Sequence, residues 1–168
     1  MKKSIFEKPL LSTKVKSANV KLPEMLFGYF LGPFGALLAS GIFTSFLNRY
    51  WTDILFANYK VGGALPDNIN LFLTLLPLLS AILIVAGNLT AGQLIERTKT
   101  RAGKARPWIL LSSILLGASC IAMFIVPMGN GESAPVATMV LTAIAYNLYY
   151  SVAYPLYNTA NSTLVPVS

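Results

Sequence analysis

The sequence has no histidine and a single cysteine, and these two absences limit the chemistry open to the chain. Histidine is the commonest general base and metal ligand near neutral pH, and no cluster of Cys, Asp or Glu takes its place. Cys120 lies in the middle of an apolar run, so no intrachain disulfide can form and the thiol is expected to be a small core side chain. These absences argue against an enzyme and against a metal or other cofactor.

Charged residues are also scarce, at 11% of the chain against 55% hydrophobic residues. Soluble domains contain roughly a quarter charged residues, so the composition indicates an integral membrane protein with membrane lipid as a partner. The net charge of +7 does not indicate nucleic-acid binding, because the basic residues form two clusters beside apolar runs. Residues 1–21 contain six lysines and lack the apolar core of a signal peptide, so we predict a basic cytoplasmic arm there.

Five basic residues crowd into the polar segment 96–107, which lies between two uncharged apolar runs. Each cation would cost about 2.5–3.5 kcal/mol at the centre of a bilayer, whereas each flanking run can cross about 30 Å of hydrocarbon as a helix. We therefore predict an all-α, polytopic membrane protein whose membrane region covers residues 22–168. Four transmembrane helices are expected at about these positions: 25–47, 69–95, 108–127 and 136–160.

The distribution of Lys and Arg predicts how these helices are oriented. Eleven of the thirteen lie in the arm and in the segment 96–107, whereas only Arg49 and Lys60 lie between the first two spans. Cytoplasmic segments of membrane proteins are enriched in Lys and Arg. Both the N-terminus and the C-terminus are therefore expected to face the cytoplasm.

Neutral polar residues recur along the fourth predicted span at intervals of three and four, which places them on one helix face. Amides and hydroxyls facing lipid would leave hydrogen bonds unmade, so this face is expected to line the bundle interior or a wet cavity. Tyrosine rings and Asn side chains also suit the faces and hydroxyls of a sugar. The alternative is that the face joins helices through hydrogen bonds worth about 0.6 kcal/mol each. We predict a substrate pathway lined by Asn147, Tyr150, Ser151, Tyr154, Asn158 and Asn161.

The segment from Gly92 to Leu111 resembles the loop between helices two and three of the glycoside-pentoside-hexuronide:cation symporters, a branch of the major facilitator superfamily. Ten residues match the pattern of that loop, and Glu96 stands where the family usually has Asp. The matching residues are Gly92, Arg97, Thr98, Lys99, Arg101, Gly103, Lys104, Arg106, Pro107 and Trp108. Weaker similarities at residues 50–53 and 154–166 extend the resemblance over nearly the whole chain from about Leu22 onward.

The resemblance implies a sugar or glycoside permease of a bacterial inner membrane, working by alternating access within a twelve-helix major facilitator fold. It also implies a cytoplasmic charge gate, because an ion-pair network at a helix mouth can close one side of a pathway. The implied gate residues are Gly92, Glu96, Arg97, Arg101 and Arg106. For Arg101 and Arg106, a role in orienting the helices alone is the alternative.

The sequence departs from the melibiose-type members where these bind the coupling cation and the sugar. Ile84 and Asn88 stand where carboxylates of helix two bind Na⁺ or H⁺, and Pro155 replaces a threonine that assists them. Leu37 and Asn158 stand at the positions of the sugar-binding carboxylates. Neutral side chains do not exchange protons, so a facilitator, a coupling site elsewhere and a different substrate all stay open.

Family members have twelve spans, so four spans would need the remaining transmembrane helices of the same transporter as partners. We expect the chain to be a fragment or a truncated gene product. Two alternative functions follow from the missing carboxylates and the length. One is a lipid or lysolipid carrier of the same fold, and the other is a non-transporting subunit that packs against other membrane proteins.

Overall fold

The computed structural model describes residues 22–26, 31–99, 104–128 and 135–163, and within these ranges most of the chain is helical. The α-helices are α1 (Leu22–Met25), α2 (Gly32–Tyr50), α3 (Asp67–Arg97), α4 (Arg106–Ile125), α5 (Pro135–Asn147) and α6 (Tyr154–Ser162). Two π-helical segments, η4 (Trp51–Leu55) and η6 (Leu148–Ala153), and a 3₁₀ turn, η5 (Ala57–Tyr59), complete the described elements.

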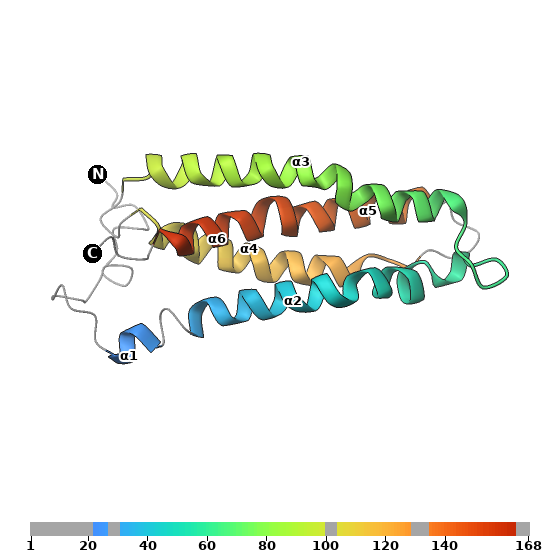
Figure 1. Ribbon diagram of the computed structural model, residues 1–168, viewed down its shortest axis with the longest axis horizontal. Helices are drawn as coiled ribbons and strands as arrows, with labels where there is room; N and C mark the ends of the chain where they lie inside the picture. Colours follow the sequence, from blue (N-terminus) through green and yellow to red (C-terminus); the bar gives the residue numbers. More distant parts are fainter. Residues whose placement is uncertain (1–21, 27–30, 100–103, 129–134, 164–168) are drawn as a thin grey trace.

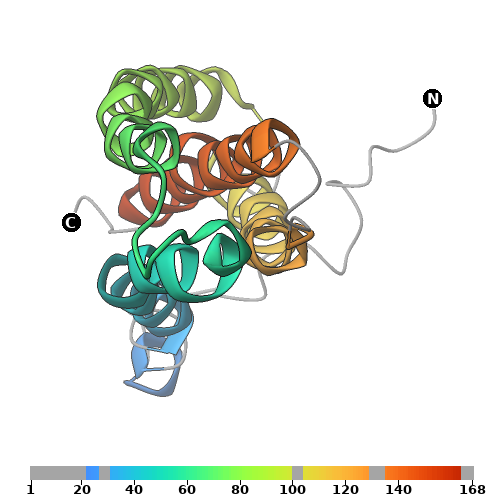
Figure 2. The ribbon, with the colours of Figure 1, turned by 90° about the vertical axis from the view of Figure 1, so that its right-hand side faces the viewer.

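The long helices form an elongated bundle (Figure 1). In it, α2, α3, α4 and the continuous helix made by α5, η6 and α6 run roughly along one axis. Figure 2 shows the α5–η6–α6 helix between α3 and α4, and α6 packs against both of these helices. Helix α2 is joined to it through aromatic rings, because Phe43 meets Tyr149 edge-on with ring centroids 4.8 Å apart. The α5–η6–α6 helix is therefore the centre of the bundle.

Among the described residues, three helices are long and apolar enough to cross a membrane: Asp67–Arg97, Arg106–Ile125 and Pro135–Ser162. Each begins and ends within two residues of a predicted span. The prediction of an all-α membrane protein is thus confirmed, but a fourth transmembrane helix is not. Helix α2 has 19 residues and is not among the three, because over its described length glycines, Pro33 and the polar pair Asn48 and Arg49 lower its mean hydropathy. Residues 27–30 of the predicted first span and the predicted arm at residues 1–21 lie outside the described residues.

The spans bury small hydroxyl residues and expose large apolar ones, as membrane helices do. Ile82 on α3 is 71% exposed and Ile125 on α4 is 69% exposed. The buried polar residues are Ser80, Ser112, Ser119, Thr138, Thr142 and Ser151. Ser119 Oγ, for example, donates to the Leu116 carbonyl at 2.9 Å. Because such bonds stay within one helix, Ser112, Ser119 and Thr142 can be buried without a partner on a neighbouring helix.

Proline marks the start of α4, and two glycines form the turn between α2 and α3. Pro107 lies in the first turn of α4, where its missing N–H has no helical acceptor to lose. The connection from α2 to α3 turns at Gly62 and Gly63, whose φ angles of 59° and 86° favour glycine. Backbone hydrogen bonds of 2.9 and 3.2 Å between Val61 and Ala64 close this turn. The connection is therefore compact and stays close to the end of the bundle.

Candidate functional site

Two adjoining cavities lie near the end of the bundle where α2 continues into η4. The larger, of about 380 Å³, is lined by Asn48, Trp51, Thr52, Asn70, Leu73, Thr74 and Pro77. The smaller, of about 270 Å³, is lined by Phe43, Thr44, Leu47, Asn48, Trp51, Pro77, Tyr146 and Tyr150. The two share Asn48, Trp51 and Pro77, so we treat them as one site and call it the paired cavity. It joins α2 and η4 to α3 on one side and to α5 and η6 on the other.

Aromatic rings form one part of the paired cavity. The ring centroids of Trp51 and Tyr146 are 5.6 Å apart, and those of Tyr146 and Tyr150 are 4.5 Å apart. Aromatic pairs of this kind contribute about 0.5–1.5 kcal/mol beyond the area they bury, so they fix the shape of this part. Flat apolar faces are what a sugar ring needs to pack against.

The rest of the polar lining is uncharged. Thr44, Asn48 and Thr52 follow one another at intervals of four on α2 and η4, and Asn70 and Thr74 are four apart on α3. The Asn48 amide makes no hydrogen bond within the part of the chain that the structure describes. That same part contains no group of three or more His, Cys, Asp or Glu residues that could hold a metal ion. The paired cavity therefore fits a neutral polar molecule.

A small ion-pair cluster lies beside the paired cavity. Lys60 Nζ donates to Asp53 Oδ1 at 3.1 Å, and Arg49 Nε lies 3.5 Å from Asp53 Oδ2. Asp53 directly follows the cavity residue Thr52 in η4. The hydrogen bond from Lys60 is the largest influence that holds the pKa of the Asp53 carboxyl below its ordinary value. These contacts tie the α2–α3 connection to η4.

Of the six predicted pathway residues, only Tyr150 lines the paired cavity. Ser151 is buried, and its Oγ donates to Asn147 Oδ1 at 2.9 Å. Asn147 Nδ2 in turn donates to the Ala143 carbonyl at 2.9 Å. These two polar side chains therefore satisfy each other along one helix.

The remaining three pathway residues lie further along the same helix. Tyr154 stacks on Tyr149 with ring centroids 6.0 Å apart. Asn158 is exposed and Asn161 is half-buried, and neither lines the paired cavity. Their role in a pathway stays a prediction.

The predicted gate residues lie at the opposite end of the bundle, around the α3–α4 connection. Glu96, Arg97 and Arg106 are exposed, and Gly92 is half-buried one turn before Glu96 on α3. Within the described ranges no ion pair joins Glu96 to a basic side chain, and Arg101 lies outside those ranges.

A hydrogen bond does connect the two sides of that connection. Trp108 Nε1 on α4 donates to Thr98 Oγ1 at 2.7 Å, and Thr98 Oγ1 donates to the Leu94 carbonyl at 2.7 Å. Thr98 and Trp108 are two of the ten residues that match the symporter loop, and their hydrogen bond holds the ends of α3 and α4 together.

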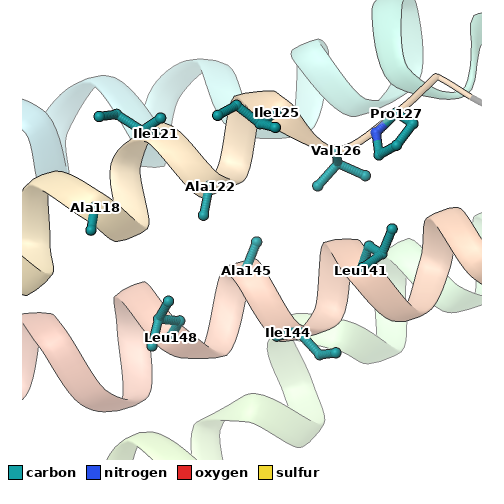
Figure 3. A pocket seen from close by; sticks show the side chains of 10 residues that line it. All are labelled: Ala118, Ile121, Ala122, Ile125, Val126, Pro127, Leu141, Ile144, Ala145 and Leu148. Atoms are coloured by element: carbon teal, nitrogen blue, oxygen red, sulfur yellow. The ribbon is translucent and has the colours of Figure 1, made fainter.

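A third cavity, of about 440 Å³, lies between α4 and the α5–η6–α6 helix (Figure 3). Ala118 and Ala122 on α4 point toward the facing helix, and Ala145 on α5 points back at them. All ten lining residues are apolar: Ala118, Ile121, Ala122, Ile125, Val126, Pro127, Leu141, Ile144, Ala145 and Leu148. Because it has no side chain that can form a hydrogen bond, this cavity does not suit a polar solute.

The pathway prediction omits the α2 side of the paired cavity. The intervals of four that join Thr44, Asn48 and Thr52 are the same signal that singled out the fourth span. Asn70 and Thr74 show it again on α3. These residues were therefore accessible to the same reasoning. The sequence could not predict that these residues come together around Trp51, because that depends on how three helices pack.

The family model described as MFS/sugar transport protein matches residues 28–168. No curated protein sequence and no solved structure matches the chain. The match includes all three membrane-spanning helices and every residue of the paired cavity. The chain therefore belongs to the MFS/sugar transport protein family and is a membrane protein of the major facilitator superfamily.

Proposed function

We propose that the chain is part of a secondary transporter, a permease for a sugar, glycoside or similar small polar solute. Within the superfamily we assign it to the branch that its α3–α4 connection resembles, the glycoside-pentoside-hexuronide symporters. The paired cavity is the observation that supports this best, since it combines aromatic faces with uncharged amides and hydroxyls inside a membrane bundle. Further transmembrane helices of the same transporter would supply the other wall of the pathway.

The paired cavity opens toward the outer side of the membrane in this proposal. It lies near η4, whereas the α3–α4 connection lies at the other end of the bundle (Figure 1). Lys104 and Arg106 are exposed in that connection, and basic segments are retained in the cytoplasm. We therefore propose an outward-facing vestibule in a bacterial inner membrane, with both termini in the cytoplasm.

A coupling cation has little to bind at the family's position on helix two. Asn88 is exposed, and its Nδ2 donates to the Ile84 carbonyl at 2.9 Å, which leaves one amide oxygen for an ion. We propose that transport does not depend on Na⁺ or H⁺ held at Asn88. Uptake into vesicles under an imposed Na⁺ or pH gradient tests this, since an Asn88→Leu variant should respond to either gradient as the parent does.

Sugar counterflow in vesicles made with the full transporter tests the proposed function itself. Asn48→Leu removes the one amide shared by both halves of the paired cavity and should reduce uptake at least tenfold. Asn68→Leu makes the same change at an exposed position outside the cavity and should leave uptake within about twofold of the parent. Absence of counterflow with every sugar tried, or equal uptake by both variants, would contradict the proposal.

The apolar third cavity favours one other function, a carrier of lipids or lysolipids with the same fold. Its 440 Å³ and wholly apolar lining suit an acyl chain better than a sugar. The same vesicles loaded with a fluorescent lysolipid distinguish the two functions. Lysolipid transfer that is abolished by Ala122→Phe and unaffected by Asn48→Leu would establish the carrier in place of the permease.

A further inference from the structure

We propose that the hydroxyl of Tyr149 is a second contact for the solute, which lies behind the paired cavity and is covered by aromatic rings in this conformation. This second contact rests on the proposed function, since it adds a residue to the route that the solute takes inward. Its basis is a buried polar group that the fold leaves without a hydrogen bond.

Tyr149 in η6 is fully buried, and its hydroxyl has no hydrogen-bond partner among the residues that the structure describes. The buried hydroxyls of Ser119 and Thr142, by contrast, donate to carbonyls of their own helices. Tyr149 cannot copy these bonds, because its hydroxyl lies at the far end of a rigid ring. A phenylalanine would fill the same space without the unfavourable burial of an unpaired hydroxyl. Packing alone therefore does not account for a tyrosine at this position.

The partner of this hydroxyl has to come from outside the fold. The described helices already enclose Tyr149, so further helices of the transporter cannot reach it while this conformation lasts. A phenolic hydroxyl can both donate and accept a hydrogen bond. A sugar hydroxyl that arrives after the covering rings have moved would satisfy it.

The covering rings are part of the wall of the paired cavity. Tyr149 meets Phe43 and Tyr150 edge-on, with ring centroids 4.8 Å apart in each pair. Both of these neighbours line the smaller half of the cavity. A solute that passes between Phe43 and Tyr150 would therefore meet Tyr149 next.

Tyr149 also belongs to a row of rings that follows the axis of the bundle. In this row Trp51 is followed by Tyr146, Tyr150, Tyr149 and Tyr154, with neighbouring centroids 4.5–6.0 Å apart. Tyr154 begins α6, which runs toward the α3–α4 connection (Figure 1). The segment η6 is π-helical, and such segments are frequent at functional sites. The row therefore leads from the paired cavity toward the cytoplasmic end of the proposed transporter.

The unpaired hydroxyl favours movement of the solute in that direction. It raises the free energy of the closed conformation, in which it has no partner. It lowers the free energy of the conformation in which Phe43 and Tyr150 have separated and the solute binds Tyr149. A ligand shifts a conformational equilibrium only through such a difference between two states.

Tyr149→Phe tests this role, because it removes the hydroxyl and keeps the ring. Counterflow of glucose, galactose and melibiose is measured in vesicles made with the full transporter, and the sugar that the parent moves fastest is then used. Y149F should lower its maximal counterflow rate at least fivefold, the effect of one hydrogen bond. Binding of that sugar in lipid nanodiscs, measured by calorimetry, should stay within about twofold, since the paired cavity itself is unchanged. The unfolding temperature should equal or exceed that of the parent, because the fold loses no hydrogen bond.

Tyr50→Phe is the matched control, since it removes a phenolic hydroxyl from a half-buried ring outside the row. Tyr50 packs against Phe124 with ring centroids 4.9 Å apart and lines neither half of the paired cavity. Y50F should leave both counterflow and binding within about twofold of the parent.

The outcomes separate the role of Tyr149 from the proposed function. If the parent moves none of the sugars, the proposed function fails and the second contact fails with it. If the parent transports and Y149F is equally fast, the function stands and the hydroxyl does not meet the solute. A lower unfolding temperature for Y149F, or a loss of binding as large as the loss of rate, would also overturn the assignment, because the hydroxyl would then support the fold or the paired cavity.

Discussion

Gly87 on α3 packs directly against the backbone carbonyl of Ser151 in η6. A Cβ added at Gly87 would collide with that oxygen and would lie 3.6 Å from Pro155 Cγ. Pro155 has no N–H, so it cannot donate to the Ser151 carbonyl as the fourth residue of an α-helix normally does. The helix α3 therefore meets the central helix of the bundle where the regular hydrogen-bond pattern of that helix is interrupted, and only glycine leaves room for the contact.

We predict that Gly87→Ala destabilises the protein by about 1–3 kcal/mol, because the new methyl group has to push two backbones apart. Thermal unfolding in detergent, followed by circular dichroism, measures the effect. Gly117→Ala on α4 is the matched control, since a Cβ there meets nothing within 4 Å. The control should be neutral or slightly stabilising, because alanine favours helix over glycine. Equal unfolding temperatures for the two variants would show that α3 does not contact η6 at Gly87.

The ion-pair cluster of the α2–α3 connection predicts how Asp53 titrates. Because Lys60 lowers the pKa of Asp53 below its ordinary value of 3.8, the pair stabilises the fold above that pH. The contribution is lost as the pH falls through the lowered pKa. Carbon NMR of the labelled carboxyl should give a pKa below 3.8 in the parent. Lys60→Gln should raise it more than Arg49→Gln does, and the opposite order would contradict the assigned geometry.

The hydrogen bond between Trp108 and Thr98 predicts a specific loss of stability. Thr98→Val removes the acceptor of the indole N–H and leaves this half-buried donor without a partner, which should cost about 1–3 kcal/mol. Thr90→Val also removes a hydroxyl that donates to its own helix, at 3.0 Å, but no other side chain depends on it. Unfolding temperatures of the two variants measure the difference. A loss in T90V as large as in T98V would indicate that the Trp108 contact adds nothing.

The orientation of the bundle predicts which thiols an impermeant reagent can reach. In a Cys120→Ser background the chain has no cysteine, so single exposed positions can be tested one at a time. Lys104→Cys should react only after the membrane is opened, whereas Asn68→Cys at the start of α3 should react on intact cells. The reverse pattern would place the basic connection outside and would invert the proposed topology.

Much of the bundle could be predicted from charge and hydropathy. The cations of residues 96–107 cannot enter a bilayer cheaply, so α3 and α4 have to end near them, and both do so within two residues of the predicted spans. The end of the first span was harder to predict. Helix α2 continues past the predicted limit of residue 47 and includes the polar residues Asn48 and Arg49. A polar residue at a helix end looks the same in sequence whether it leaves the membrane or lines a cavity.

The pathway prediction did not include the π-helical segment η6. It assumed a regular helix with 3.6 residues per turn across residues 136–160. A π-helical turn contains about one more residue, which rotates everything beyond it by roughly 100°. The helix faces before and after η6 are therefore offset from each other; Asn158 is exposed, and its role in a pathway stays a prediction. No local signal in this stretch except Pro155 points to such an interruption.

A solute site that is reached from outside, between α2 and α3, is the central feature of the proposed transporter. Asn48→Cys in the Cys120→Ser background tests it in one measurement, because Asn48 is exposed and lines both halves of the paired cavity. We predict that an impermeant thiol reagent modifies Asn48→Cys on intact cells and that a transported neutral sugar slows the reaction at least threefold. Modification that requires an opened membrane, or a rate that no sugar changes, would contradict the account.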